Sequence, residues 1–328
     1  MTNMRADRID DIARHVAARL EGVVPASGPV GTWEVPDIGW RMPFPGTRGR
    51  TPERASGAAS VTAIPPNHPP VQHRAHVGPG QRAVRIADYV DHTLLKADAT
   101  REQIEALCTE AAEHRFAAVC VNGCWVPLCR RLLAGTGVKL AAVVGFPLGA
   151  MTSEAKAAEA RQLVELGADE LDMVAAVGHI LDGDWDYVEH DICAVVDAAR
   201  ARTVKVILET AALEPLQVVK AAAIAKEAGA HFVKTSTGFH PAGGATADAV
   251  ALMRLVVGDE LGVKAAGGIR DCATALRMVA AGANRIGTSS GVKFVECLGR
   301  GAAPLAELLS APERHEPVCA TGDCPSSY

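Results

Sequence analysis

The sequence lacks several features that would place it in particular classes of protein. It has no uninterrupted apolar run approaching the roughly 20 residues that cross a bilayer, which argues against a membrane protein. Its formal net charge is -5 at pH 7, without the basic stripe that a nucleic-acid partner requires. Its first residues also lack the apolar run of a signal peptide. We therefore expect a cytoplasmic protein whose partner is a small molecule.

The nine cysteines form no C-x-x-C pair and have no accompanying histidines at zinc-site spacing. We interpret them as reduced thiols in a reducing compartment. The sequence predicts neither a metal nor a cofactor.

The 328 residues divide into three parts according to their pattern. Residues 1–84 form an N-terminal extension, with one amphipathic helix expected over 5–21, followed by a Pro- and Gly-rich irregular segment. Residues 85–310 alternate short β-branched runs with longer Ala-rich stretches, and 311–328 is a polar tail expected to be flexible. The alternation predicts parallel strands joined by crossover helices.

Eight strand candidates in the middle part favour a (β/α)₈ barrel, the TIM barrel, over an open sheet. Helix starts are expected at Thr100, at Thr152 with Ser153, and at Asp271. The candidate strands are 88–93, 117–121, 139–146, 170–175, 204–210, 232–237, 262–267 and 284–289.

Several candidate strands carry a charged residue inside an apolar run. In VKVILET the two-residue period of a strand places Lys205 and Glu209 on the face that points to the barrel axis. The same alternation directs Asp172, Lys234 and Lys264 to the interior. We therefore expect a cluster of buried charges inside the barrel.

Buried charges need partners, so these groups are expected to face one another. Three lysines would then face two carboxylates, Asp172 and Glu209, and one neutral lysine would balance the set. A neutral amine crowded by an ammonium group is what a Schiff-base nucleophile requires. For any single lysine, a solvated strand end or a structural ion pair is the simpler interpretation, but three coincident cases favour chemistry. For Asp91, the sequence leaves substrate contact and a structural role open.

Glycine-rich loops follow the last strand candidates, at 266–270 and 287–291. In many barrels the loops after strands seven and eight bind phosphate through backbone N–H groups and a helix N-terminus. Each glycine motif alone would serve a tight turn equally well. Their joint position favours phosphate, and the loop 235–238 is a candidate to complete the site.

Four segments together resemble the deoxyribose-phosphate aldolase family over about residues 86 to 295. They are VVGFPLGAMTSEAKAAEARQLVELGADELDMV, VKVILET, FVKTSTGF and VKAAGGIRDCATALRMVAAGANRIGTSSG. The resemblance implies reversible cleavage of 2-deoxy-D-ribose 5-phosphate to D-glyceraldehyde 3-phosphate and acetaldehyde, through a lysine imine and without a metal.

The resemblance also implies roles for individual residues. Lys234 matches the imine-forming lysine, and Lys264 matches the second lysine that keeps it nucleophilic. Asp172 matches the proton-transfer residue, and Lys205 matches a lysine of the same polar network. The implied phosphate contacts are Gly238, Gly267, Gly268, Gly287, Ser289 and Ser290.

The two ends of the chain and position 239 can also be compared with the family. Phe239 stands where some family members have a lysine that helps to hold the phosphate, and the long N-terminal extension has no counterpart in the compact members. Some members end in a mobile tail whose terminal tyrosine reaches the site, which makes Tyr328 a candidate catalytic residue. A homo-oligomer, namely a dimer, is the expected assembly.

Two other functions remain open at this point. One is a different Schiff-base barrel enzyme, such as a transaldolase-like or 2-keto-3-deoxy acid aldolase, which substrate profiling would distinguish. The other is a non-catalytic sugar-phosphate-binding barrel, which would have no need of Lys234, Lys264 and Asp172 together.

Overall fold

The computed structural model describes residues 83–310. The expected N-terminal helix and the tail with Tyr328 lie outside the described residues, as does the irregular segment up to residue 82.

Eight parallel strands close into a barrel in chain order, and β9 pairs with β2 to complete it. Each strand overlaps its expected range, so the predicted (β/α)₈ architecture is confirmed. Several strands end earlier than expected because the residues that follow leave the ladder and form loops. The strands are β2 (Val90–Leu94), β3 (Ala118–Val121), β4 (Lys139–Val144), β5 (Glu170–Val174), β6 (Thr203–Ile207), β7 (Phe232–Lys234), β8 (Gly262–Ala266) and β9 (Arg285–Thr288).

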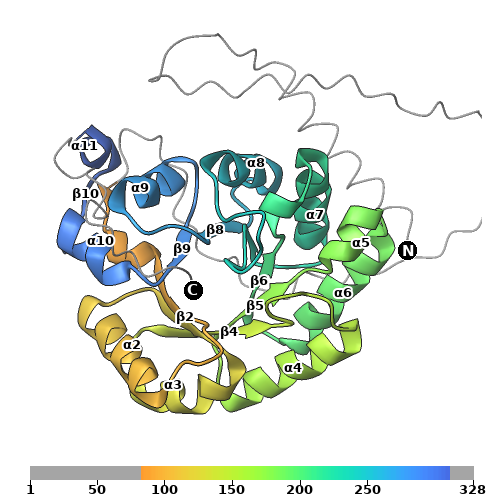
Figure 1. The fold of residues 1–328 in the computed structure, drawn as a ribbon, viewed down its shortest axis with the longest axis horizontal. Helices are drawn as coiled ribbons and strands as arrows, with labels where there is room; N and C mark the ends of the chain where they lie inside the picture. The colour runs from red at the N-terminus through yellow and green to blue at the C-terminus, as the bar shows by residue number, and fades with distance from the viewer. Residues whose placement is uncertain (1–82, 311–328) are drawn as a thin grey trace, which may run out of the picture.

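Helices surround the strands in chain order, as Figure 1 shows. They are α2 (Arg101–His114), α3 (Val126–Leu132), α4 (Ser153–Leu166), α5 (Val177–Asp182), α6 (Trp185–Ala198), α7 (Pro215–Glu227), α8 (Ala247–Val257), α9 (Cys272–Ala280), α10 (Gly291–Leu298) and α11 (Leu305–Ser310). The expected caps are confirmed, because the side chains of Thr100, Thr152 and Asp271 accept backbone N–H groups at the starts of α2, α4 and α9.

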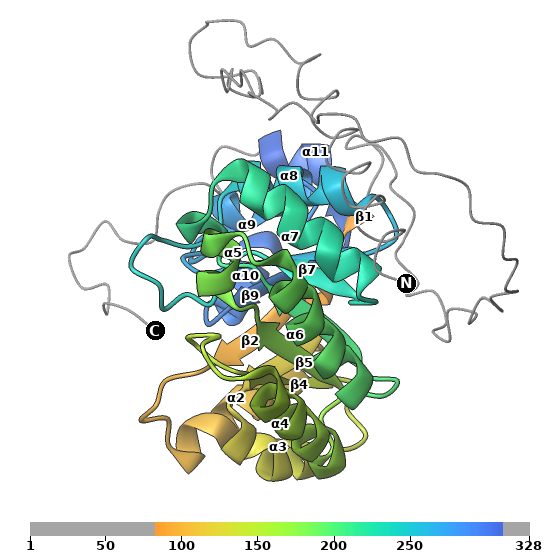
Figure 2. The ribbon, with the colours of Figure 1, turned by 90° about the vertical axis from the view of Figure 1, so that its right-hand side faces the viewer.

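The strands present two different faces. Val204, Val206 and Leu208 belong to the main apolar core, which lies between the barrel and its helices. A second, smaller cluster contains Leu95, Cys120, Ala141 and Val143. The side view in Figure 2 shows α4, α6 and α7 along one flank of the barrel.

Outside the barrel, a short antiparallel pair of strands joins segments near the two ends of the described residues. In it, β1 (Ala83–Val84) pairs with β10 (Ala303–Pro304), just before α11. Within residues 83–310, no helix combines the length and the apolar character needed to cross a membrane.

Candidate active site

The strand register gathers the charged residues. Asp172 on β5 pairs with Lys205 on β6, and Lys234 on β7 pairs with Lys264 on β8. These four side chains are buried, as the alternation of each strand predicted.

Asp172 lies at the centre of this arrangement. Its Oδ2 accepts from Lys234 Nζ at 2.9 Å and from Lys264 Nζ at 2.7 Å. Its Oδ1 accepts from Lys205 Nζ at 2.9 Å. One carboxylate therefore bridges all three lysines that the sequence singled out.

Three further charged residues complete the set. Asp91 on β2 accepts from Lys264 at 2.5 Å and from Arg285 Nε at 2.6 Å. Glu170 on β5 accepts from Lys205 at 2.5 Å and from Arg285 Nη2 at 2.9 Å. We call the seven residues the charged cluster: Asp91, Glu170, Asp172, Lys205, Lys234, Lys264 and Arg285.

Glu209 is not a member of the cluster, so its expected place opposite the lysines was wrong. Strand β6 ends at Ile207, and Glu209 adopts a left-handed backbone with φ 59°. This turn carries its carboxylate to Thr237, in the loop after β7. Alternation predicts side-chain direction only while the chain stays extended.

The cluster contains four basic and three acidic groups that are joined by direct ion pairs. If all seven were ionised, one positive charge would remain without a counter-charge inside the barrel, which is costly. One neutral lysine balances the cluster. The expectation of one neutral lysine thus has a physical basis in the structure, with Asp91, Glu170 and Arg285 in place of Glu209.

Lys234 is the lysine that favours the neutral form. Burial lowers the pKa of its amine below the ordinary value; Asp172 opposes this effect, and the ammonium of Lys264 adds to it. Lys264 shifts the other way, because Asp172 and Asp91 outweigh burial and raise its pKa. The pKa of Lys205 is also raised, since Asp172 and Glu170 outweigh its burial.

The carboxylates stay ionised for the converse reason. Burial acts to raise the pKa of Asp172, but Lys205, Lys234 and Lys264 together hold it well below its usual value. The site therefore places an amine with a lowered pKa beside one with a raised pKa, and both donate to one carboxylate oxygen.

Three loops meet beside the cluster at the carboxyl ends of β7, β8 and β9. A Cβ atom on Gly267 would lie 3.3 Å from Gly238 Cα, and one on Gly244 would lie 2.3 Å from the Gly267 oxygen. Thr288 Oγ1 donates to the Ile269 oxygen at 2.7 Å, which links the loops after β8 and β9. Because glycine has no Cβ, these backbones approach closely enough to form one cradle.

The expected phosphate residues do not all lie in this cradle. Gly238, Gly267 and Gly268 lie in its loops with φ between 78° and 89°, and Ser290 precedes α10 after the exposed Ser289. Gly287 lies within β9 instead, where a Cβ would come 3.1 Å from Lys264 Cε. Its missing side chain makes room for the lysine.

Cys120 and two aromatic rings lie near these groups. The Cys120 Sγ is 4.0 Å from Asp172 Oδ2, and burial raises the pKa of this thiol. Phe239 makes an edge contact with Phe146, with ring centroids 5.2 Å apart. The Thr237–Gly238 loop therefore leads directly into an aromatic contact at Phe239.

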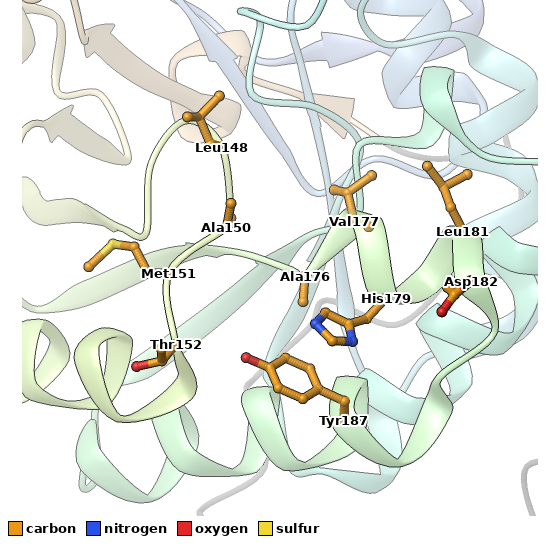
Figure 3. A pocket seen from close by; sticks show the side chains of 12 residues that line it. Leu148, Ala150, Met151, Thr152, Ala176, Val177, His179, Leu181, Asp182 and Tyr187 are labelled. Atoms are coloured by element: carbon orange, nitrogen blue, oxygen red, sulfur yellow. The ribbon is translucent and has the colours of Figure 1, made fainter.

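A separate pocket of about 660 Å³ lies between the loop after β4 and helices α5 and α6 (Figure 3). Leu148, Met151 and Leu181 line it, and the His179 ring stacks on Tyr187 at 3.7 Å. No member of the charged cluster lines this pocket.

The profile of the DeoC/LacD family aldolase matches residues 85–296, which is the barrel itself. The chain belongs to the DeoC/LacD aldolase family. The matched range of this aldolase contains all seven residues of the charged cluster.

Named relatives agree with this assignment. The deoxyribose-phosphate aldolase of Geobacillus sp. strain WCH70 is 56% identical over 212 residues, covering 64% of this chain and 95% of that protein. The enzyme of the same name from Thermotoga maritima is 55% identical over 211 residues, 64% of this chain and 85% of that protein. The structure of deoxyribose phosphate aldolase from Aeropyrum pernix, described as tetrameric, superimposes with a TM-score of 0.61 at 35% identity, covering 65% of this chain and 90% of that one. As a DeoC/LacD aldolase, the chain is a carbon–carbon lyase, which excludes the non-catalytic barrel.

Proposed function

We propose that this aldolase cleaves 2-deoxy-D-ribose 5-phosphate reversibly to D-glyceraldehyde 3-phosphate and acetaldehyde through an imine on Lys234. The observation that carries the proposal is the shared oxygen of Asp172, which holds Lys234 beside the ammonium of Lys264. The relatives named deoxyribose-phosphate aldolase support this substrate over a keto sugar phosphate or a keto acid.

The first step is imine formation. The neutral amine of Lys234 attacks the C1 aldehyde of the open-chain sugar, and loss of water from the carbinolamine gives the protonated imine. Lys264 is the ammonium closest to this reaction, and Asp172 contacts both amines, so this pair is suited to move the required protons.

The second step breaks the bond between C2 and C3, because the products contain two and three carbons. The C3 hydroxyl loses its proton and becomes the aldehyde of the three-carbon product. The electron pair of the C2–C3 bond moves toward the imine nitrogen and leaves an enamine. Protonation at C2 and hydrolysis then release acetaldehyde and restore the amine, so no metal is needed as an electron sink.

Each remaining residue has one role in this proposal. Lys205 holds Asp172 in place from its other oxygen. Gly238, Gly267, Gly268, Ser289 and Ser290 bind the phosphate, whereas Gly287 acts by admitting Lys264. The phosphate orients the far end of the sugar, so an unphosphorylated sugar should lose turnover as well as affinity. Tyr328, outside the described residues, is proposed to exchange a proton with the enamine carbon.

We propose further that the protein is cytoplasmic and forms a homodimer. The seven cysteines of the described residues are all free thiols, as is usual in a reducing compartment. The Aeropyrum pernix relative is described as tetrameric, and a twofold dimer is the commonest symmetric assembly of soluble proteins.

Chemical trapping tests the proposed function directly. The protein is incubated with acetaldehyde and sodium borohydride, which reduces any imine to a stable amine, and the modified peptide is mapped by mass spectrometry. We expect the added mass on Lys234, and none in the Lys234→Met variant. A label on Lys264 or Lys205 would contradict the assignment. A parallel assay should detect release of acetaldehyde from 2-deoxyribose 5-phosphate.

A further inference from the structure

Glu209 is a buried carboxylate that the proposed mechanism does not use. It belongs to the loop after β6, yet its hydrogen bonds go to the loop after β7. Its Oε2 accepts from Thr237 Oγ1 at 2.5 Å, and its two oxygens lie 3.3 and 3.2 Å from the Thr237 N–H. The carboxylate thus holds both the backbone and the side chain of one residue.

The backbone of Glu209 is strained in a way that other residues of the described chain are not. Only three non-glycine residues between 83 and 310 have positive φ, namely Arg115, Arg200 and Glu209. Arg115 and Arg200 lie at the ends of helices α2 and α6, where this conformation is common. Glu209 lies at the end of a strand beside the charged cluster, and such strain is typical of functional sites.

The bonds of Thr237 fix the direction of its hydroxyl. A carboxylate only accepts hydrogen bonds, so the Thr237 hydroxyl must be the donor in its bond with Glu209. The hydroxyl oxygen is then free to accept from the Phe239 N–H, at 3.1 Å. Gly238, with φ 86°, is the residue that these bonds enclose.

The same loop is anchored on its other side by Thr235. The Thr235 Oγ1 donates to the Ala266 oxygen and accepts from the Ala266 N–H, both at 3.0 Å, which ties the loop to β8. Between the two anchors, the buried Ser236 hydroxyl has no hydrogen-bond partner among the described residues. Thr235 and Thr237, and not Ser236, therefore determine the position of the turn.

We propose that Glu209 is a positioning residue for phosphate recognition, an inference that rests on the proposed function. It holds the Thr237–Gly238 turn close to Gly267, where the two loops form the cradle. The backbone of the turn then faces the phosphate of the substrate. Glu209 itself is buried and acts through Thr237 without touching the sugar. The carboxylate is needed because an amide at this position offers one acceptor oxygen where two are used.

The test compares phosphorylated with unphosphorylated sugar. In Glu209→Ala we expect the KM for 2-deoxyribose 5-phosphate and the inhibition constant of inorganic phosphate each to rise at least tenfold. The kcat/KM for unphosphorylated 2-deoxyribose should fall much less, so that the preference for the phosphorylated sugar drops at least tenfold. Glu214→Ala removes an exposed carboxylate from the same loop and serves as the matched control, with no change in this preference.

Variants that preserve volume keep the test decisive if Glu209→Ala does not fold. Glu209→Gln and Thr237→Val should show the same selective loss, whereas Thr237→Ser retains the hydroxyl and should restore phosphate preference. The double variant Glu209→Gln with Thr237→Val should lose less than the sum of the two single losses, because both changes disrupt the bond between the Glu209 carboxylate and the Thr237 hydroxyl. Equal losses with both sugars, or an unchanged inhibition constant for phosphate, would overturn the proposal.

The wild-type protein separates this inference from the proposed function. If it fails to trap acetaldehyde on Lys234 or to prefer the phosphorylated sugar, the proposed function is wrong. If it does both, and the Glu209 variants trap acetaldehyde normally but keep their phosphate preference, only the role of Glu209 is wrong.

Discussion

The pKa values of two lysines on neighbouring strands, Lys234 and Lys264, are shifted in opposite directions by their neighbours. Both contact Asp172, but Lys264 also contacts Asp91 at 2.5 Å. The second carboxylate makes Lys264 the better site for a proton, and its positive charge then disfavours one on Lys234. Asp91 therefore distinguishes the two amines, and in the proposed mechanism this contact leaves Lys234 as the nucleophile.

This relationship predicts how activity depends on pH. Because burial and Lys264 lower the pKa of Lys234, its neutral form is populated at lower pH than that of an ordinary lysine, and kcat/KM should rise as the pH rises through that pKa. In Lys264→Met, two ammonium or guanidinium groups and Lys234 would face three carboxylates, so charge balance favours a protonated Lys234. The rising limb should move upward by about one pH unit or more.

A pH series of kcat/KM and of the borohydride trapping rate measures this shift. Lys226→Met, which removes a lysine paired with Glu260 on the outer surface, is the control and should leave the limb in place. A limb that does not move in Lys264→Met would mean that Lys264 does not tune the nucleophile.

For single residues, the sequence predicted the inward position of the lysines better than it predicted their ion-pair partners. Strand alternation alone placed Lys205, Lys234, Lys264 and Asp172 inside the barrel, since each lies within an extended run. Asp91 remained undecided, and Glu170 and Arg285 were missed, although each stands at a strand position with the inward parity. Their pairing spans β2, β5 and β9 and depends on closure of the barrel, which a local pattern does not contain.

At the scale of elements, helix α4 is attached to its neighbours by polar groups along one face. Lys156 Nζ donates to Asp191 of α6 at 2.6 Å and to the Val174 oxygen at the end of β5 at 3.0 Å. Ser153 also donates to Asp191, at 3.1 Å. Both members of the ion pair are fully buried, so α4, α6 and the end of β5 are held by charges that water does not screen.

Removing the charge of only one member of this ion pair should destabilise the protein. Asp191→Asn leaves the Lys156 ammonium buried without its counter-charge, and we expect the free energy of unfolding to fall by about 3 kcal/mol or more. The double variant Lys156→Met with Asp191→Leu replaces both charges by apolar groups and should recover most of the loss.

Urea unfolding followed by circular dichroism measures both effects. Glu260→Gln, which breaks the exposed pair with Lys226, is the control and should change the midpoint little. Equal losses in the single and the double variant would mean that shape, not the buried charge, determines the cost.

The element boundaries show where sequence patterns stop being informative. The alternation of β-branched runs with Ala-rich stretches predicted every strand of the barrel, but it also extended β6 to residue 210 and β7 to residue 237. Both strands end earlier, at Ile207 and Lys234, because Glu209 and the loop after Lys234 bond to each other across the site. Only the folded barrel brings these two loops together, so neither strand alone carries the signal.

At the scale of the whole molecule, the charged groups and the apolar core lie on opposite faces of the barrel strands. The seven charged groups meet on the axis, whereas the main apolar core lies between strands and helices. Such a barrel keeps its reactive groups on rigid strands and leaves recognition to the loops, as other barrels do. The family match over residues 85–296 coincides with this unit and leaves the first 84 residues outside it.

The barrel should therefore fold without most of the N-terminal extension. A chain that begins at residue 81 retains β1 and all eight barrel strands, so we expect it to be soluble, to trap acetaldehyde on Lys234 and to keep its melting temperature within a few degrees of the full chain. A chain that begins at residue 86 also loses Val84, which is 1% exposed in the core, together with the β1–β10 pair. Burial of a valine side chain contributes about 1.5 kcal/mol or more, and in a domain of this size that corresponds to a melting temperature lower by roughly 5 °C. Calorimetry on the three chains decides between the alternatives: a shorter chain that is insoluble already at residue 81 would mean that the extension forms part of the core or of an obligatory interface, whereas equal melting temperatures for both truncations would mean that the β1–β10 pair does not stabilise the barrel.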